Sequence, residues 1–467
     1  MILAVKNNSI KKNTSNAQLK RNENVSFGHV SSRSTKALDA FVKSQENLSS
    51  TRFIQGTLTN WFPKAVLSRS FVDFSEFTFL ELLESGIFYF AAPFFGEHLF
   101  RNKLFKSAQP KELKDTITKN LPKSIEEIKN SNMDKLLKNR MITSKGGVVL
   151  ACAAVPALEY ALGFAKNLFT LKVFKVSNFD NVANLNKEKT EDTNQQQRVE
   201  KHSKQVLAKM GALIAGGIVG GLALAKGGYK SNAAVKFSEA LLEPGEQISK
   251  LLHKVGIKSN KTDKFLKEYM KLDFDNNNGK LALSKGQLAL TCITGLFGYS
   301  SAAKDRGKLD FLEVWTRVPL VVLYTIFGSA LLDGSFKKYL ANKGKFPELI
   351  KRGANGEIAP VPKRVELPAI AEKVANANKT LKEVELDKLI RQKAVITGVP
   401  YLFSLVTMGF VLSAVSRIWT KYRFDHGVKS DVSAKQSQVQ DSQTAKFLKV
   451  SPAFSGFQLR GVQAPVK

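Results

Sequence analysis

The sequence predicts an all-α, multi-pass helical membrane protein. Hydrophobic residues make up 43% of its 467 residues, but they gather in about six apolar blocks separated by polar tracts rich in Lys, Asn and Ser. One of these blocks, 394–416, has 23 residues and no charged side chain. A helix of about 20 apolar residues is long enough to cross the hydrocarbon core of a bilayer. The net charge of +31 favours a polyanionic partner such as the head groups of anionic lipid.

The block 394–416 carries the clearest signal for a membrane span. It reads AVITGVPYLFSLVTMGFVLSAVS and lies between Lys393 and Arg417, with Trp419 and Tyr422 beyond it. Basic and aromatic residues at the ends of an apolar helix are typical of the two membrane interfaces. We therefore expect this block to span the membrane.

The other five blocks are shorter or carry a few charges. They cover residues 77–100, 146–165, 210–225, 286–303 and 318–332. The third and the fifth of the six blocks are short for a bilayer, and flanking lysines would have to extend them by reaching to the interface. For each of the five, a buried core helix of a large soluble bundle is the alternative.

The blocks fall into three successive pairs, and each pair encloses a long basic loop. We expect three helical hairpins connected by polar segments, with disordered tails. The predicted division is a basic N-terminal arm over 1–70, a first hairpin over 71–175, a polar linker over 176–204, a second hairpin over 205–304, a third hairpin over 305–424 and a polar C-terminal tail over 425–467. The arm is Ser/Asn/Lys-rich and poor in acidic residues, so an organelle transit peptide is an alternative to a disordered arm.

One basic phrase occurs twice, each time before an apolar block. DKLLKNRMIT covers 134–143 and DKLIRQKAVIT covers 387–397, while 263–270 is a looser third version. The apolar residues of the two good copies recur at i, i+3, i+4 and i+8, which places them on one helix face. We expect a basic amphipathic helix at the surface of anionic lipid. Its lipid-facing basic residues would be Lys135, Lys138, Arg140, Lys388, Arg391 and Lys393. The alternative is a chance likeness between two ordinary helices.

Three carboxylates within the apolar blocks are candidates for a functional site. They are Glu84, Glu97 and Glu159. Ionisable groups in lipid are costly, and they usually line a polar path or meet a partner. Glu159 stands in the middle of its block, with a structural pair to Lys166 as the alternative, whereas Glu84 lies near the start of its block and would also reach the interface.

The block 210–225 contains two overlapping Gly-x-x-x-Gly spacings. They are formed by Gly216 with Gly220 and by Gly217 with Gly221. Glycines at this spacing let two helix backbones approach closely. We expect close packing within the chain, or a homo-oligomer through this helix.

The sequence predicts neither an enzyme nor a metal site. Cys152 and Cys292 both lie in apolar blocks, and we expect them to be small buried hydrophobes. The stretch DFDNNNGKLALS, 273–284, places its glycine and its last residue wrongly for a calcium loop. An Asn-Gly turn, followed by Ser284 at the start of the next helix, is the better interpretation. No cofactor motif is present in the sequence.

Two functions of different classes agree with these observations. The first is a structural or scaffolding membrane protein that associates with anionic lipid. The alternative is a transporter or channel built from helical hairpins, which would need several polar groups facing one another inside the membrane. A soluble basic helical protein is a further alternative. We expect no specific nucleic-acid partner, because the charge is mostly lysine and is spread over every polar tract.

Overall fold

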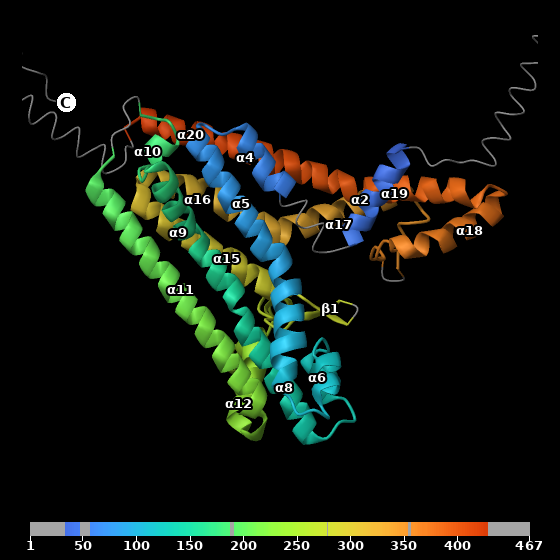
Figure 1. Ribbon diagram of the computed structural model, residues 1–467. Coiled ribbons are helices and arrows are strands. Elements are labelled where there is room, and N and C mark those ends of the chain that lie inside the picture. The colour runs from blue at the N-terminus through green and yellow to red at the C-terminus, as the bar shows by residue number, and fades with distance from the viewer. Residues whose placement is uncertain (1–32, 47–56, 187–190, 278, 354–355, 428–467) are drawn as a thin grey trace, which may run out of the picture. The chain divides into compact units, whose positions relative to one another are not determined.

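The computed structural model describes residues 33–46, 57–186, 191–277, 279–353 and 356–427 (Figure 1). About 80% of the structure is helical, which confirms the all-α class. The chain divides into two compact units. Of the described residues, those within 57–326 and 408–427 form the larger unit, and those within 33–46 and 327–407 form the smaller one.

The larger unit is a bundle of long helices with short elements between them. Its elements up to α11 are η1 (Thr57–Trp61), α4 (Phe62–Val66), α5 (Phe71–Ala91), η2 (Ala92–Phe105), α6 (Lys114–Asn120), α7 (Ile125–Lys129), α8 (Lys135–Cys152), α9 (Ala154–Phe174), α10 (Phe179–Val182) and α11 (Thr193–Gly227). The elements after α11 are η3 (Gly228–Lys230), α12 (Asn232–Leu242), α13 (Pro244–Lys254), α14 (Asn260–Tyr269), β1 (Asp275–Asn277), β2 (Lys280–Ala282), α15 (Lys285–Arg306), α16 (Lys308–Leu323) and, at the C-terminal side, α20 (Leu412–Asp425). Here η1 and η2 are π-helical and η3 is a 3₁₀ turn.

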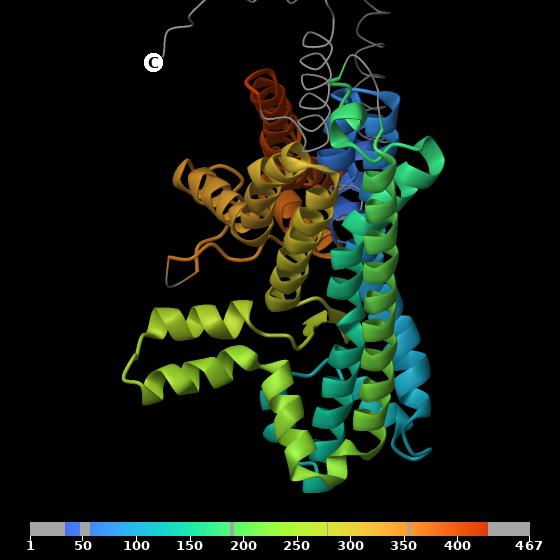
Figure 2. The same ribbon diagram turned by 90° about the vertical axis from the view of Figure 1, so that its left-hand side faces the viewer.

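Helices α8 and α9 form the centre of this bundle. They follow one another with a break at Ala153, just before Pro156, whose ring cannot donate the next hydrogen bond of the ladder. Helix α11 packs along both of them, α15 packs along α9 on the way to α16, and α5 packs on α9 (Figures 1 and 2). The third apolar block therefore packs mainly on the second, so the arrangement in three hairpins is not confirmed.

Two glycines allow α8 and α11 to touch through their backbones. A methyl group added to Gly221 would lie 2.4 Å from the carbonyl oxygen of Gly147, and one added to Gly147 would lie 2.4 Å from that of Gly221. Gly217 similarly faces the carbonyl oxygen of Leu150. The glycine-rich helix thus packs closely within the chain, whereas Gly216 faces open space.

The turn before α15 has the conformation expected from its residues. Strands β1 and β2 form a short antiparallel hairpin, and Gly279 adopts a φ of +79° in its turn. Ser284 caps α15 by accepting a hydrogen bond from the backbone N–H of Gln287, whose side chain accepts one from Ser284 in return. The predicted cap is therefore confirmed, and Gly279 has the positive φ that the predicted turn requires, whereas Asn278 lies outside the described residues.

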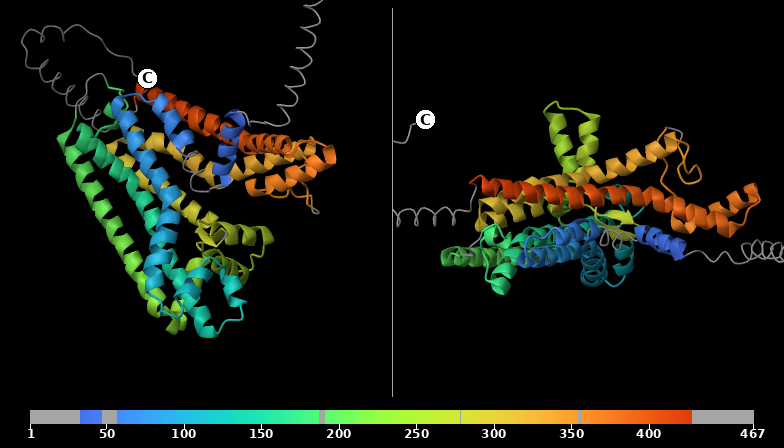
Figure 3. Two further views of the ribbon diagram at one scale, coloured as in Figure 1. Left: turned by 45° about the vertical axis from the view of Figure 1, so that its right-hand side comes forward. Right: turned by 90° about the horizontal axis from the view of Figure 1, so that it is seen from above.

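The smaller unit has its own core. Its elements are α2 (Arg33–Glu46), α17 (Ser329–Asn342), η5 (Arg364–Glu366), α18 (Leu367–Asn378) and α19 (Lys382–Ser404). Helix α18 packs on α19 (Figure 3), and α2 also packs on α19. Leu340, Leu349, Leu367, Leu389 and Ile396 are buried together between these elements. The π-helical segments η4 (Tyr324–Gly328) and η6 (Leu405–Val411) connect α16 to α17 and α19 to α20.

All six apolar blocks are helical in the structure. Among the described residues, four helices are long and apolar enough to cross a membrane. They cover Lys135–Phe174, Thr193–Lys230, Lys308–Asn342 and Lys382–Asp425. The blocks at 77–100 and 286–303 are helical without meeting that measure.

The N-terminal arm and the repeated phrase both differ from expectation. The arm contains α2 and η1–α4, so it is not disordered throughout, whereas 1–32 and 428–467 lie outside the described residues. The repeated phrase is not a separate helix, because 135–143 forms the first turns of α8 and 387–397 lies within α19. Met141, Leu389 and Ile390 of its apolar face are buried in the two cores. The phrase therefore forms parts of two longer helices with buried faces, and contact of its exposed residues with anionic lipid stays a prediction.

Candidate functional site: a buried charged cluster

One face of α5 carries a row of carboxylates. Asp73, Glu76, Glu81 and Glu84 recur with the helical period, so they project from the same side of α5. From the first to the last they extend about 16 Å along the helix axis, which is roughly half the thickness of a bilayer core. Asp73, Glu76 and Glu81 are buried, and Glu84 is half-buried. A row of this kind requires partners from the neighbouring helices.

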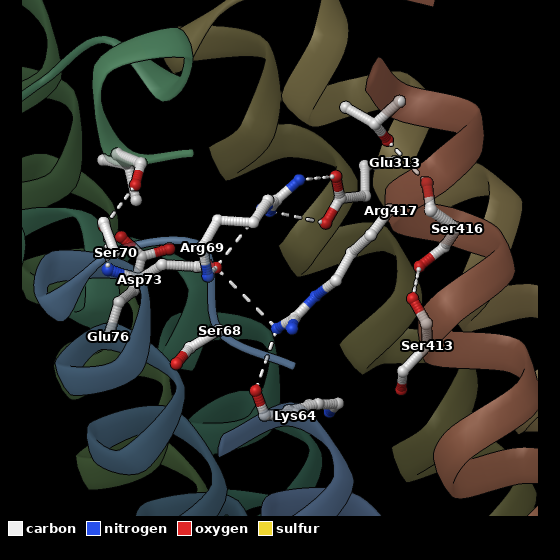
Figure 4. A network of polar contacts seen from close by, with 12 residues as sticks. Lys64, Ser68, Arg69, Ser70, Asp73, Glu76, Glu313, Ser413, Ser416 and Arg417 are labelled. Carbon is white, nitrogen blue, oxygen red and sulfur yellow. Dashed lines mark hydrogen bonds and ion pairs between the residues drawn. The ribbon is translucent and has the colours of Figure 1, made fainter. Parts of the chain in front are cut away.

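Two arginines contact Asp73 at the N-terminal end of the row (Figure 4). Arg69 makes a two-pronged ion pair with Glu313 of α16, at 2.8 and 3.0 Å, and also contacts Asp73 at 3.2 Å. Arg417 of α20 approaches Asp73 to 3.7 Å and donates a hydrogen bond to the backbone carbonyl of Lys64. Burial disfavours the charge on Arg69, but Glu313 and Asp73 outweigh burial and raise the pKa of its guanidinium. This layer ties α5, α16 and α20 together.

A second layer lies one turn further along α5. Arg306, at the end of α15, pairs with Glu76 at 2.8 Å and with Asp310 at 3.4 Å. Lys166 of α9 also reaches Glu76, at 3.0 Å. Arg306 is only 1% exposed, so its charge is balanced by protein groups and not by water.

The next two positions of the row differ in their counter-charges. Lys64 of α4 pairs with Glu81. Arg317 of α16 lies over the ring of Phe77 at 5.7 Å and lines the same cavity as Glu84. Within the described part of the chain, no carboxylate lies at ion-pair distance from Arg317. The row is therefore compensated pair by pair as far as Glu81, and the pairing stops at Glu84.

At the C-terminal end of the row, Glu84 and Glu159 both contact Tyr299. The phenol oxygen of Tyr299, on α15, lies 2.7 Å from Oε1 of Glu159 and 3.2 Å from Oε2 of Glu84. Glu159 is 1% exposed, and its Oε2 has no hydrogen-bond partner among the described residues. The helices that bring these side chains together are α5, α9 and α15, which come from three different apolar blocks.

Two cavities lie along this arrangement. An inner cavity of about 70 Å³ is lined by Lys64, Glu76, Glu84, Tyr299 and Arg317, among others. An outer pocket of about 540 Å³ is lined by Arg69, by residues 183–185 after α10, and by Arg417 and other residues of α20. Asp73 lines the inner cavity and contacts both arginines of the outer pocket, so one ion-paired layer separates the two spaces.

These residues form one set, which we call the charged cluster. Its cations are Lys64, Arg69, Lys166, Arg306, Arg317 and Arg417, and its carboxylates are Asp73, Glu76, Glu81, Glu84, Glu159, Asp310 and Glu313. Five cations and five carboxylates form ion pairs with one another. Arg317, Glu84 and Glu159 form no ion pair among the described residues, and the cluster holds six positive groups against seven acidic ones.

The structure brings together two of the three carboxylates that the sequence singles out. Glu84 and Glu159 belong to the charged cluster, whereas Glu97 pairs with Arg101 at 2.7 Å and accepts a hydrogen bond from the backbone of Leu281 beside the β-hairpin. Sequence reasoning missed Arg306, Asp310 and Glu313, because they stand in what reads as a polar link between two apolar blocks. The spacing of Asp73, Glu76, Glu81 and Glu84 was the signal that could have revealed the row.

The six basic residues assigned to a lipid surface divide into two groups. Lys135, Lys388 and Arg391 are exposed, and Lys138 is half-buried with its amine on the carbonyl of Lys129.

Arg140 and Lys393 are buried inside the protein. Arg140 lies 3.8 Å over the ring of Tyr229 and donates to Gln109, and Lys393 donates to the carbonyl of Pro362. These two are therefore not available to a lipid surface, because their helix faces pack against other parts of the chain.

Within the described residues, no group of three His, Cys, Asp or Glu side chains is placed to hold a metal ion. No family model matches the chain, and neither a curated protein nor a solved structure is significantly similar to it.

Proposed function

We propose that the protein is a multi-pass integral membrane protein that passes small inorganic ions or protons through its charged cluster. The observation that carries the proposal is the row of four carboxylates on α5 with its counter-charges on α4, α9, α15, α16 and α20. Burying this many charges is expensive in any medium, and in membrane proteins such groups mark ion and proton pathways. A purely structural bundle would be served as well by apolar contacts.

The outer faces of the helices support a membrane environment. Val219 of α11 is 66% exposed and Leu323 of α16 is 54% exposed, and both lie within membrane-length helices. Large apolar side chains that are exposed on such helices are unfavourable in water and ordinary in contact with lipid chains. Trp419 and Tyr422 are also exposed near the end of α20, where aromatic anchors of a span are expected.

The cavity volumes indicate the size of the solute. A cavity of about 70 Å³ holds a few water molecules, since one water needs about 10–15 Å³ measured this way. An inorganic ion or a proton carried by water fits this space, whereas an organic metabolite does not. The outer pocket of about 540 Å³ would admit the hydrated ion before it sheds water.

Cysteine accessibility tests whether water reaches the inner cavity. The background would carry Cys152→Ala and Cys292→Ala, so that the introduced thiol is the only one in the chain. Both native thiols are buried. Arg317→Cys places a thiol on the cavity wall, and Leu323→Cys places one on the outer, apolar side of the same helix. With a hydrophilic thiosulfonate reagent, we expect Arg317→Cys to react at least about ten times faster, because the thiolate that reacts forms in water and not in lipid.

The two thiols serve as controls for each other because they share α16. Equal, fast modification at both positions would show that the outer face of α16 is in water, which contradicts membrane embedding. Modification at neither position in folded protein would show that the cavity is closed to water, which contradicts the ion path.

A second candidate function is the scaffolding protein on anionic lipid that the sequence suggests. The observation in its favour is the hairpin of α13 and α14, which projects from the neighbouring helices of its unit (Figure 2). Leu251, Val255, Ile257 and Phe265 are exposed on it, among several lysines. Exposed apolar groups with lysines suit the interface of an anionic membrane. Self-association would use the free face of α11 at Gly216, since Gly217 and Gly221 already contact α8.

A further inference from the structure

The proposed ion path ends on two carboxylates, and this inference depends on that proposal. We infer that Glu84, Tyr299 and Glu159 together bind one proton, which the two carboxylates hold between them through the phenol oxygen. The site would couple the charged cluster to protons and not to metal cations. Its residues come from α5, α15 and α9, so it forms only when the three helices are packed together.

Hydrogen-bond counting gives the first argument. A phenol has one proton, so Tyr299 can donate to only one of the two carboxylates. Its oxygen nevertheless lies at hydrogen-bond distance from both, at 2.7 Å from Glu159 and 3.2 Å from Glu84. The second contact is attractive only when that carboxyl is protonated and donates to the phenol oxygen. If both carboxylates were ionised, one of them would face a lone pair of the phenol oxygen and not its hydrogen.

The surroundings of Glu159 give an independent argument. Its Oε2 is buried and has no hydrogen-bond partner among the described residues, which is costly for an ionised carboxylate. A side chain on Gly295 would meet the Glu159 carboxyl at about 3 Å, so α15 closes the site on that side. A proton on the pair removes the charge that this closed site cannot solvate.

The charges that face the pair support one proton. Lys64, from α4, is paired with Glu81 and also attracts Glu84, and Arg317, from α16, attracts Glu84 without lying at ion-pair distance from it. Cys292 and Tyr299 of α15 are the other titratable groups near the two carboxylates. Both cations act on Glu84, whereas no cation lies at ion-pair distance from Glu159 among the described residues, so one proton on the pair removes the charge that no cation balances.

The geometry also provides a route for the proton. Glu84 is half-buried and lines the inner cavity, whereas Glu159 is enclosed. A proton taken up by Glu84 passes to the oxygen of Tyr299 while the phenol O–H bond breaks and its proton forms an O–H bond on Glu159. One proton moves from Glu84 to Glu159, and the phenol is regenerated.

Infrared titration of the purified full-length protein in detergent tests the site. A protonated carboxyl has a C=O stretch distinct from that of a carboxylate. We expect the wild type to keep one such buried carboxyl at neutral pH and to lose it as the pH is raised. Glu159→Gln should abolish this band, and Glu84→Gln should change it, while the matched control Glu97→Gln should leave it intact because Glu97 is paired with Arg101.

Tyr299→Phe carries the test if the glutamate variants do not fold, because it keeps the ring and removes only the hydroxyl. In this variant the band should move to the frequency of a carboxyl without a phenol partner. A band that persists unchanged in Glu159→Gln or in Tyr299→Phe would overturn the inference. A midpoint that moves with sodium concentration would assign the pair to a metal cation instead. The measurement needs no ion flux, so its failure is distinguishable from failure of the proposed ion path.

Discussion

Gly221→Leu is expected to lower the stability of the protein by about 3 kcal/mol or more, as overpacking of a tight contact does. The added side chain begins 2.4 Å from the carbonyl oxygen of Gly147, a backbone atom that cannot move without displacing α8. Glycine inside a helix normally costs stability relative to other residues, so replacing it should otherwise help. Because of the close contact with α8, we expect the replacement of Gly221 to lower the stability instead. Thermal unfolding in detergent measures the effect.

Gly216→Leu is the matched control for this variant. It makes the same chemical change five residues earlier on the same helix, at a position where no neighbouring helix or loop comes within 4 Å of the added side chain. We expect near wild-type unfolding for Gly216→Leu. Equal loss in both variants would show that α11 tolerates no leucine on either face, and no loss in Gly221→Leu would contradict the backbone contact between α8 and α11.

Arg306→Gln is expected to destabilise the bundle by about 3–5 kcal/mol, the usual cost of leaving a buried charge without its partner. Glu76 would keep Lys166, but Asp310 would lose the only cation that lies at ion-pair distance from it among the described residues. The change also removes a hydrogen bond to Asn167. Unfolding of the purified protein, followed by the loss of helical signal on heating, reports the effect.

Lys304→Gln controls for the change of net charge. It removes one positive charge from the same end of α15, at an exposed side chain. We expect an effect of less than about 0.5 kcal/mol, as is usual for surface positions. If the two variants were equally stable, Arg306 would not be the centre of a buried ion-paired layer.

The helices could be predicted from the sequence, because the hydrophobic pattern of each block is local. All six blocks are helical, and the Ser284 cap and the Asn-Gly turn also follow from short-range chemistry. Which blocks pack on one another could not be predicted. Helix α11 packs closely on α8 because glycines on both helices leave no side chains between them. The two faces lie far apart in the sequence, so the sequence does not indicate which helix packs on a glycine face.

The candidate site could be predicted only in part for the same reason. Glu159 and Glu84 stand out within apolar blocks, but Tyr299, which connects them, is an ordinary aromatic residue until α15 is placed against α9. Arg306 and Asp310 lie between two blocks and resemble a loop. The environment of the repeated phrase could not be predicted for a physical reason as well, since an amphipathic basic helix packs on a protein core or on a lipid surface with the same spacing of apolar residues.

Extraction of native membranes tests the central claim most directly, because an ion path requires that the chain crosses a bilayer. Membranes from cells that express the full-length protein would be washed with alkaline carbonate and, in parallel, with detergent. With four helices of membrane length, the protein should stay in the membrane pellet under carbonate and be released by detergent. Release by carbonate alone would contradict membrane embedding, and the buried charges would then belong to a soluble helical bundle.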